Sequence, residues 1–131
     1  MAVGLAANPV ANAMLDLFGN ATSAGYATPH VSLHTADPGA AGTTALVSPD
    51  PTRKAVAFAA AGGGSKAANG TLPSWTNWAS GTETVSHLGL WTASSAGTFL
   101  GSVALTVPKV VNDTDTFNIT AITLAISTLA A

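Results

Sequence analysis

The chain has 131 residues, enough for one domain with a modest core, and a formal net charge of −2 at pH 7. Only 8% of its residues are charged, so it has neither the basic surface that nucleic acid requires nor the polybasic run that binds a membrane surface. It contains no cysteine, which excludes disulfides, thiolate zinc sites and cysteine nucleophiles.

The scarcity of charge predicts assembly into something larger, because a freely diffusing monomer usually carries more charge to stay soluble. No run of about 18 apolar residues occurs, so we predict no membrane span. The apolar N-terminus lacks basic residues and is interrupted by Asn8-Pro9 and Asp16, so we also predict no signal peptide.

One helix is indicated near the N-terminus. Asn8 can cap it, Pro9 suits the first helical position and Gly19 can end it. Four residues at helical spacing would form one apolar face of this helix: Val10, Met14, Leu17 and Phe18. So short a helix is marginal alone in water, so its face must dock on its own domain or on a neighbouring subunit. We predict that residues 1–19 form an attachment segment within a single domain of residues 1–131.

The rest of the chain reads as β structure. Apolar residues alternate in "HVSLHT", "KAVAFAA", "TVSHLGLW" and "TFLGSVAL", and turn-forming segments rich in Gly, Pro, Ser and Asp lie between these runs. In "FNITAITLAIS" the alternation changes phase near Ala121, which indicates a bulge or a strand that changes sheets. The prediction is an all-β fold, an antiparallel β-sandwich of jelly-roll type with one short N-terminal helix. Eight residues are expected to be buried: Val56, Phe58, Leu88, Leu90, Val103, Leu105, Ile122 and Leu124.

The stretch "HVSLHTADPG" places two histidines four residues apart. In a strand, His30, Ser32 and His34 share one face. Two imidazoles can begin a zinc site that Asp37 or His87 would complete, but no third ligand stands at a recognised spacing. We therefore predict no metal, a strand with its polar face outward, and a β-turn at Asp-Pro-Gly.

The other polar residues do not suggest an active site. His87 could act as a general base, but a partly buried histidine bonded to a neighbour is the expected role. No Gly-x-Ser-x-Gly elbow lies near a His/Asp pair. "NDTD" lacks the Gly and Glu of a calcium loop, and "GGGSK" lacks the spacing and helix of a phosphate loop. We predict no enzymatic activity, no catalytic residue and no cofactor.

Trp75 and Trp78 lie close together in "PSWTNW". They could form a platform on which carbohydrate stacks, or they could be packing anchors in the core or at a subunit interface. Packing is the favoured alternative.

Four segments are together typical of one family: "VSLHTADPGAAGTT", "RKAVAF", "VSHLGLWTASSAGTFLGSVAL" and "VNDTDTFNITAITLAI". Over residues 29–127 the sequence resembles small virion proteins of tailed phages, often labelled tail-fibre-like, that occur in phages of actinobacteria and in prophages. The resemblance implies an all-β module that assembles with copies of itself on a virion, with no catalytic or metal role for "LHTADPG".

Two functions remain open. The first expectation is a capsid decoration or minor capsid protein, because the chain is one module without a shaft, is poor in charge and has a helix suited to docking. The alternative is a tail-fibre or receptor-binding module that recognises a host surface polymer, as the family label and the tryptophan pair suggest. The expected partners are other copies of the chain in a homotrimer and the major capsid protein or tail proteins, with no nucleic acid and no membrane. The expected location is the virion, assembled in the host cytoplasm.

Overall fold

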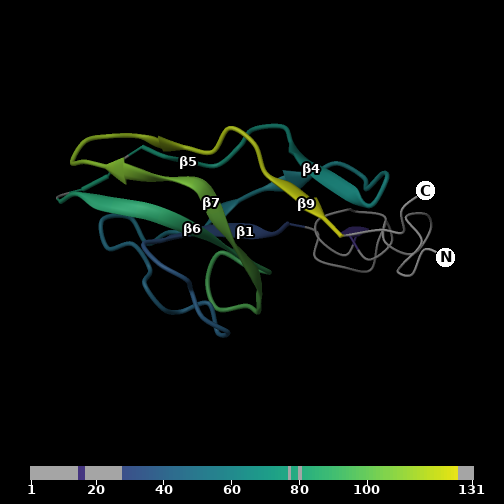
Figure 1. The fold of residues 1–131 in the computed structure, drawn as a ribbon, viewed down its shortest axis with the longest axis horizontal. Coiled ribbons are helices and arrows are strands. Elements are labelled where there is room, and N and C mark those ends of the chain that lie inside the picture. Colours follow the sequence, from purple (N-terminus) through teal and green to yellow (C-terminus); the bar gives the residue numbers. More distant parts are fainter. Residues whose placement is uncertain (1–14, 17–27, 77, 80, 127–131) are drawn as a thin grey trace. The chain divides into compact units, whose positions relative to one another are not determined.

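The computed structural model describes residues 15–16, 28–76, 78–79 and 81–126, and these form nine strands whose pairings are all antiparallel (Figure 1). This confirms the predicted all-β, antiparallel class. The sandwich arrangement stays a prediction. No helix within the described ranges is long and apolar enough to cross a membrane.

The predicted N-terminal helix falls almost wholly outside the described residues. Leu15 and Asp16 are described and have helical backbone. Val10, Met14, Leu17 and Phe18, the predicted apolar face, lie outside the described residues. The attachment role of residues 1–19 therefore stays a prediction.

The chain divides into two compact units. The first comprises residues 1–28, 56–72 and 120–131, and the second comprises residues 29–55 and 73–119. The predicted change of phase near Ala121 coincides with the passage between them. Before Ala121, strand β8 (Phe117–Asn118) pairs with β5 (Ser74–Trp75) in the second unit. After Ala121, strand β9 (Thr123–Ala125) pairs with β4 (Ser65–Asn69) in the first unit. The two halves of "FNITAITLAIS" thus join different sheets.

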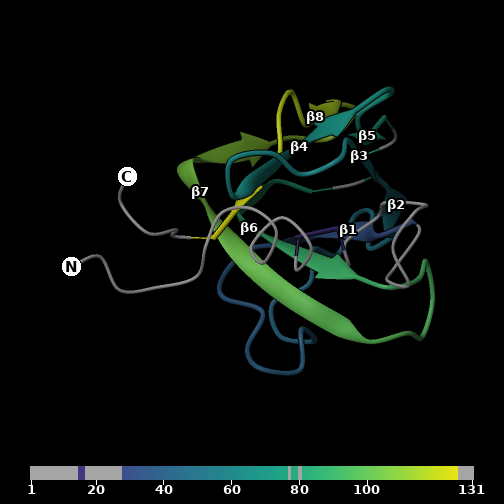
Figure 2. The same ribbon diagram turned by 90° about the vertical axis from the view of Figure 1, so that its right-hand side faces the viewer.

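The second unit is built on a four-stranded sheet in the order β2-β1-β6-β7. Its strands are β1 (His30–His34), β2 (Lys54–Ala55), β6 (Glu83–Trp91) and β7 (Phe99–Val111). Figure 2 shows β6 and β7 as the long green strands of this sheet. Because directly paired residues share a face, the pairing of Leu33 with Leu88 and of Ser32 with Gly89 gives β1 one apolar and one polar face.

The pairing of β6 with β7 is interrupted by a large bulge. Val85 pairs with Lys109, but His87 pairs with Ala104. Ser86 alone therefore lies opposite the β7 residues 105–108. Extra residues in one strand leave backbone groups unpaired and bend the strand.

The first unit holds a three-stranded sheet in the order β3-β4-β9, with β3 formed by Ala57–Phe58. Phe58 pairs with Ala68, and Lys66 pairs with Leu124. The "GGGSK" segment starts with a tight turn, in which Gly62 and Ser65 exchange backbone hydrogen bonds of 2.8 and 3.1 Å.

The predicted core is right in part. Val56, Phe58 and Leu88 are buried, whereas Leu90, Leu105, Ile122 and Leu124 are only half-buried. Val103 was predicted to be buried and is 53% exposed, so that prediction is wrong. Alternation identified which residues share a face but not whether that face is covered, and β7 is the last strand of its sheet. The other face of β6 contributes two buried residues in its place, Val85 and Trp91.

Leucine-to-alanine substitutions should separate the core from the surface of the second unit. Leu33 is 1% exposed and Leu46 is 42% exposed. Leu33→Ala should lower the free energy of unfolding by about 2–5 kcal/mol, because it leaves a cavity. The matched Leu46→Ala should change it by less than about 1 kcal/mol. Urea unfolding followed by tryptophan fluorescence measures both, and equal losses would contradict the assigned core.

Candidate functional site

The histidine stretch forms a buried chain of hydrogen bonds, here named the Ser-His-Trp relay: Trp91, Ser32, His34 and the carbonyl of Thr44. Trp91 Nε1 donates to Ser32 Oγ at 2.8 Å, Ser32 Oγ lies 2.7 Å from His34 Nε2, and His34 Nδ1 lies 2.8 Å from the Thr44 carbonyl oxygen. A carbonyl only accepts, so Nδ1 carries the proton and Nε2 accepts from the Ser32 hydroxyl. Neutral His34 therefore satisfies every link of the relay.

The polar face of β1 was predicted to point outward, and this prediction is wrong. Ser32 is 1% exposed and His34 is fully buried. The loop after β1 covers this face, since it folds back to bring the Thr44 carbonyl onto His34 and the Val47 N–H onto the Leu33 carbonyl at 3.1 Å. A polar face can be buried when each of its groups finds a partner.

The turn predicted at Asp-Pro-Gly is built differently from the expectation. The Asp37 carboxylate accepts the Gly39 N–H at 2.8 Å, and the backbone turn follows, with the Gly42 N–H donating to the Gly39 carbonyl at 3.1 Å. Gly42 has φ of 72°, and a Cβ there would lie 2.3 Å from the Phe99 ring. Only glycine provides both the left-handed backbone and this close approach.

The absence of a side chain at Gly89 leaves room for the relay. A Cβ at this position would lie 2.6 Å from Ser32 Oγ and 3.0 Å from His34 Nε2. In β6, the residue across from Ser32 must therefore be a glycine for the Ser32–His34 bond to fit. The "HLGLW" segment thus forms a strand and also supplies the glycine that this hydrogen bond requires.

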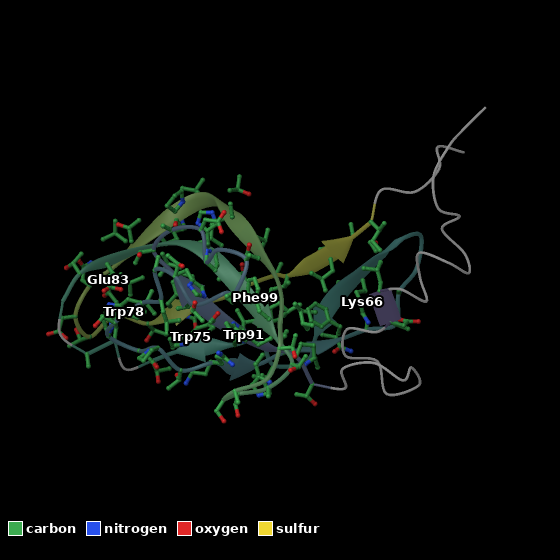
Figure 3. The ribbon with its side chains drawn as sticks, turned by 90° about the horizontal axis from the view of Figure 1, so that it is seen from below. Lys66, Trp75, Trp78, Glu83, Trp91 and Phe99 are labelled. Carbon is green, nitrogen blue, oxygen red and sulfur yellow. The ribbon has the colours of Figure 1, made fainter. Side chains whose placement is uncertain are left out.

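A second set of contacts fixes the Trp91 ring (Figure 3). The Arg53 guanidinium carbon lies 3.4 Å from the ring centroid, within cation–π distance, and the Phe99 ring packs at 5.0 Å and 60°. Arg53 also donates to the carbonyl oxygens of Ala96 at 2.6 Å and Ala93 at 3.3 Å. Arg53 therefore ties the β6–β7 connection to Trp91, a role that the sequence analysis missed because no spacing signals it.

Both ring nitrogens of His34 are engaged in the relay. Within the described ranges, no group of three or more His, Asp or Glu side chains is placed to hold a metal ion. Of the remaining candidates, Asp37 bonds within its own turn, and His87 Nδ1 lies 2.8 Å from the neighbouring Ser86 hydroxyl. The absence of metal at His30 and His34 stays a prediction.

The two tryptophans of "PSWTNW" are both buried, Trp75 at 0% and Trp78 at 1% exposure. Trp75 Nε1 donates to the Thr52 carbonyl at 2.9 Å, and its ring meets Phe117 edge-on at 6.0 Å. Trp78 Nε1 has no hydrogen-bond partner among the described residues. Neither ring offers an open face for a sugar in this structure, and their burial supports the packing alternative.

A shallow hollow of about 290 Å³ lies at the end of β7, lined by residues 109–111 and 115–118. The "NDTD" turn borders it. This segment is a turn, in which the Asp115 carboxylate accepts from the Asn112 N–H at 2.9 Å and the Asp115 N–H donates to the Asn112 carbonyl at 3.0 Å. Polar groups of both signs line the hollow, from Lys109 and Asp115, without the convergence of acid, base and nucleophile that a hydrolytic site needs.

In the first unit, Lys66 is the unexpected feature (Figure 3). It is 2% exposed, and its Nζ donates to the Leu15 carbonyl at 2.9 Å and lies 3.6 Å from the Asp16 carboxylate. Asp16 also accepts the Ala61 N–H at 2.9 Å. Burial lowers the pKa of Lys66, and the nearby Asp16 carboxylate opposes this shift. Leu15 and Asp16, inside the predicted attachment segment, are thus bonded to strand β4 of their own chain.

We expect His34 to make the second unit sensitive to acid. Burial lowers the pKa of His34, with the charges of His87 and Arg53 adding to this and the bond to Thr44 opposing it. Between the unfolded value of about 6.5 and the lower folded value, the unfolded chain binds the proton and the folded chain does not. The contribution of His34 to stability is therefore complete above pH about 6.5 and falls as the pH drops towards the folded pKa.

The measurement is the urea midpoint at a series of pH values between about 7.5 and 5. His34→Asn, which cannot titrate, should flatten this dependence while lowering stability throughout. The Leu33→Ala variant on the same strand, which loses stability but no titratable group, should keep the wild-type slope. The assignment is wrong if His34→Asn leaves the slope unchanged.

A family model described as "Podophage GP4 fiber I protein gp80" matches residues 6–127. The match therefore spans nearly the whole chain and includes segments of both units. No curated protein matches the sequence.

Proposed function

The chain belongs to the podophage fibre I protein family, and from that premise we propose that it is a non-enzymatic structural component of a phage tail fibre. Membership makes it a virion structural protein. The family description names a fibre, so the tail-fibre alternative replaces capsid decoration, our first expectation, as the leading function. The match over residues 6–127 is the observation that carries this proposal.

The positions of the side chains best suited to chemistry support a structural role. Neutral His34 uses both ring nitrogens within the relay, and Lys66 is directed into the fold towards Leu15 and Asp16. A general base must reach the proton that it removes, and a buried, bonded imidazole does not reach a substrate. The fibre component is proposed to work with other copies of itself, as a homotrimer, and with further tail proteins.

Recognition of a host surface polymer is a second candidate. The hollow at the end of β7 favours it, because Lys109, Asp115 and Asn118 place donors and acceptors along its lining. Such polar groups suit a hydroxyl-rich ligand. The buried tryptophan pair does not contribute to this argument.

Antibody labelling of intact virions tests the location. The label should decorate the tail, and quantitative mass spectrometry should find far fewer copies than of the major capsid protein. Purified tails should retain the chain, and tail-free capsids should lack it. Label spread over the capsid, with copy numbers comparable to the major capsid protein, would favour decoration and contradict the fibre assignment.

The attachment role of residues 1–19 is best tested by substitution. We expect Leu17→Ser with Phe18→Ser to leave a folded chain that no longer joins virions, because the proposed docking face loses its apolar character. Deleting residues 1–19 is less informative, since it also removes the partners of Lys66. The control is a sharp thermal transition in the double variant. Normal incorporation of this variant would move the attachment surface elsewhere on the chain.

A further inference from the structure

Strand β7 carries most of the large apolar surface that the second unit leaves in solvent. Four large apolar residues stand out as exposed in the described part of the chain, and three of them lie on β7: Val103 at 53%, Val107 at 61% and Val110 at 61%. The fourth, Leu46, is 42% exposed and lies in the loop after β1. We propose that β7 is the surface through which copies of this chain associate, an inference that rests on the proposed function and names the partner as a second copy.

The position of β7 in the sheet leaves its backbone accessible. It is the last strand in the order β2-β1-β6-β7, and β6 is its only strand neighbour among the described residues (Figure 2). It is also the longest strand, with 13 residues. A long terminal strand presents N–H and C=O groups that another chain can pair with.

The usual protection of such an edge is weak here. Proteins commonly guard edge strands with charged side chains, proline or a bulge. Residues 99–107 contain neither a charge nor a proline, and both Pro108 and Lys109 come near the end of the strand. The bulge opposite Ser86 interrupts the pairing with β6 at residues 105–108, and a second shift of register leaves Leu100 unpaired with β6. The regularly paired, neutral stretch from Gly101 to Ala104 remains available.

Charge identifies the partner as a second copy. Where identical chains meet around a rotation axis, residues close to the axis approach their own equivalents, so charges there would repel. Residues 99–108 bring none to such a contact, and Val103 and Val107 are chemically matched to themselves. An anionic polymer would require basic side chains, of which β7 has one, Lys109.

The surroundings of β7 fit the anatomy of a protein interface. Interfaces have an apolar centre and a polar rim. The exposed valines supply the centre, and Lys109, Asp115 and Asn118 around the hollow at the end of β7 supply rim groups of both signs. The low charge of the whole chain, 8% of residues, is consistent with a surface that meets protein.

The experiment measures the mass of the full-length chain in solution by sedimentation over a range of concentrations. The wild type should form a closed oligomer, whose mass also tests the proposed trimer. Val107→Asp places a charge in the contact and should weaken association at least about tenfold. Leu46→Asp is the matched control, because it makes the same change at an exposed residue off the strand, and its mass should equal that of the wild type.

Circular dichroism and a thermal melt show whether each variant is folded. If Val107→Asp does not fold, the nearly isosteric pair Val107→Thr and Val110→Thr replaces it, with the same expected direction. An oligomer that persists at wild-type strength in these variants refutes β7 as the surface. So does equal weakening by Leu46→Asp.

The outcomes separate this inference from the fibre assignment. A wild-type chain that is monomeric at every concentration, or that associates only when another tail protein is added, overturns the second copy as partner. Neither result bears on the labelling of virions, which decides the tail location. Conversely, β7-dependent oligomers of a chain found only on capsids would support this surface and refute the fibre assignment.

Discussion

The hydrogen-bonded relay from Trp91 through Ser32 and His34 to Thr44 is the constraint on which the second unit depends. It joins residues 59 positions apart in strands β6 and β1, and it ties β1 to a loop carbonyl 10 positions further on. Each of its side chains is buried, so a broken link would leave a polar group without water or partner, at a cost of about 1–3 kcal/mol. The relay also fixes the β1–β6 register, because a one-residue shift would replace Gly89 opposite Ser32 with a larger residue.

The chain has few charged residues, and some of them stabilise the fold instead of lying on its surface. Of the four basic residues, two hold segments of the chain together. Arg53 lies over Trp91 and binds two carbonyls of the β6–β7 connection, and Lys66 binds the Leu15 carbonyl beside Asp16. Placing these cations against carbonyls and an aromatic ring leaves long stretches of surface neutral, including most of β7. A chain that uses its few charges internally has little left to prevent contact with its own copies.

The sequence predicted the strands well and their environment less well. Alternation located β1, β6 and β7, and the change of phase near Ala121 marked the passage between two sheets. The alternation of apolar and polar residues does not show, however, whether a strand face is covered by another segment. Val103 was therefore placed in the core and the polar face of β1 in solvent. Both errors have one physical origin: the burial of a strand face depends on what lies outside the strand. The loop that carries Thr44 covers the polar face of β1, whereas β7 is the last strand of its sheet. Lys66 was missed for the same reason, because its partners lie 50 and 51 positions earlier, at Asp16 and Leu15.

The contrast between β1 and β7 explains why this structure points to assembly with other copies of the chain and not to chemistry at its histidines. Both strands alternate, yet β1 lies between two neighbours and has four successive buried residues, whereas β7 ends the sheet and has only Val111 buried. The histidines that suggested chemistry lie on the interior strand, where burial lowers the pKa of His34 and its hydrogen bonds engage both ring nitrogens. The exposed valines lie on the terminal strand, β7, where nothing in the described chain covers them. Because exposed apolar surface costs free energy in proportion to its area, a protein of this composition gains most by covering β7, and a second copy brings the same neutral strand to the contact.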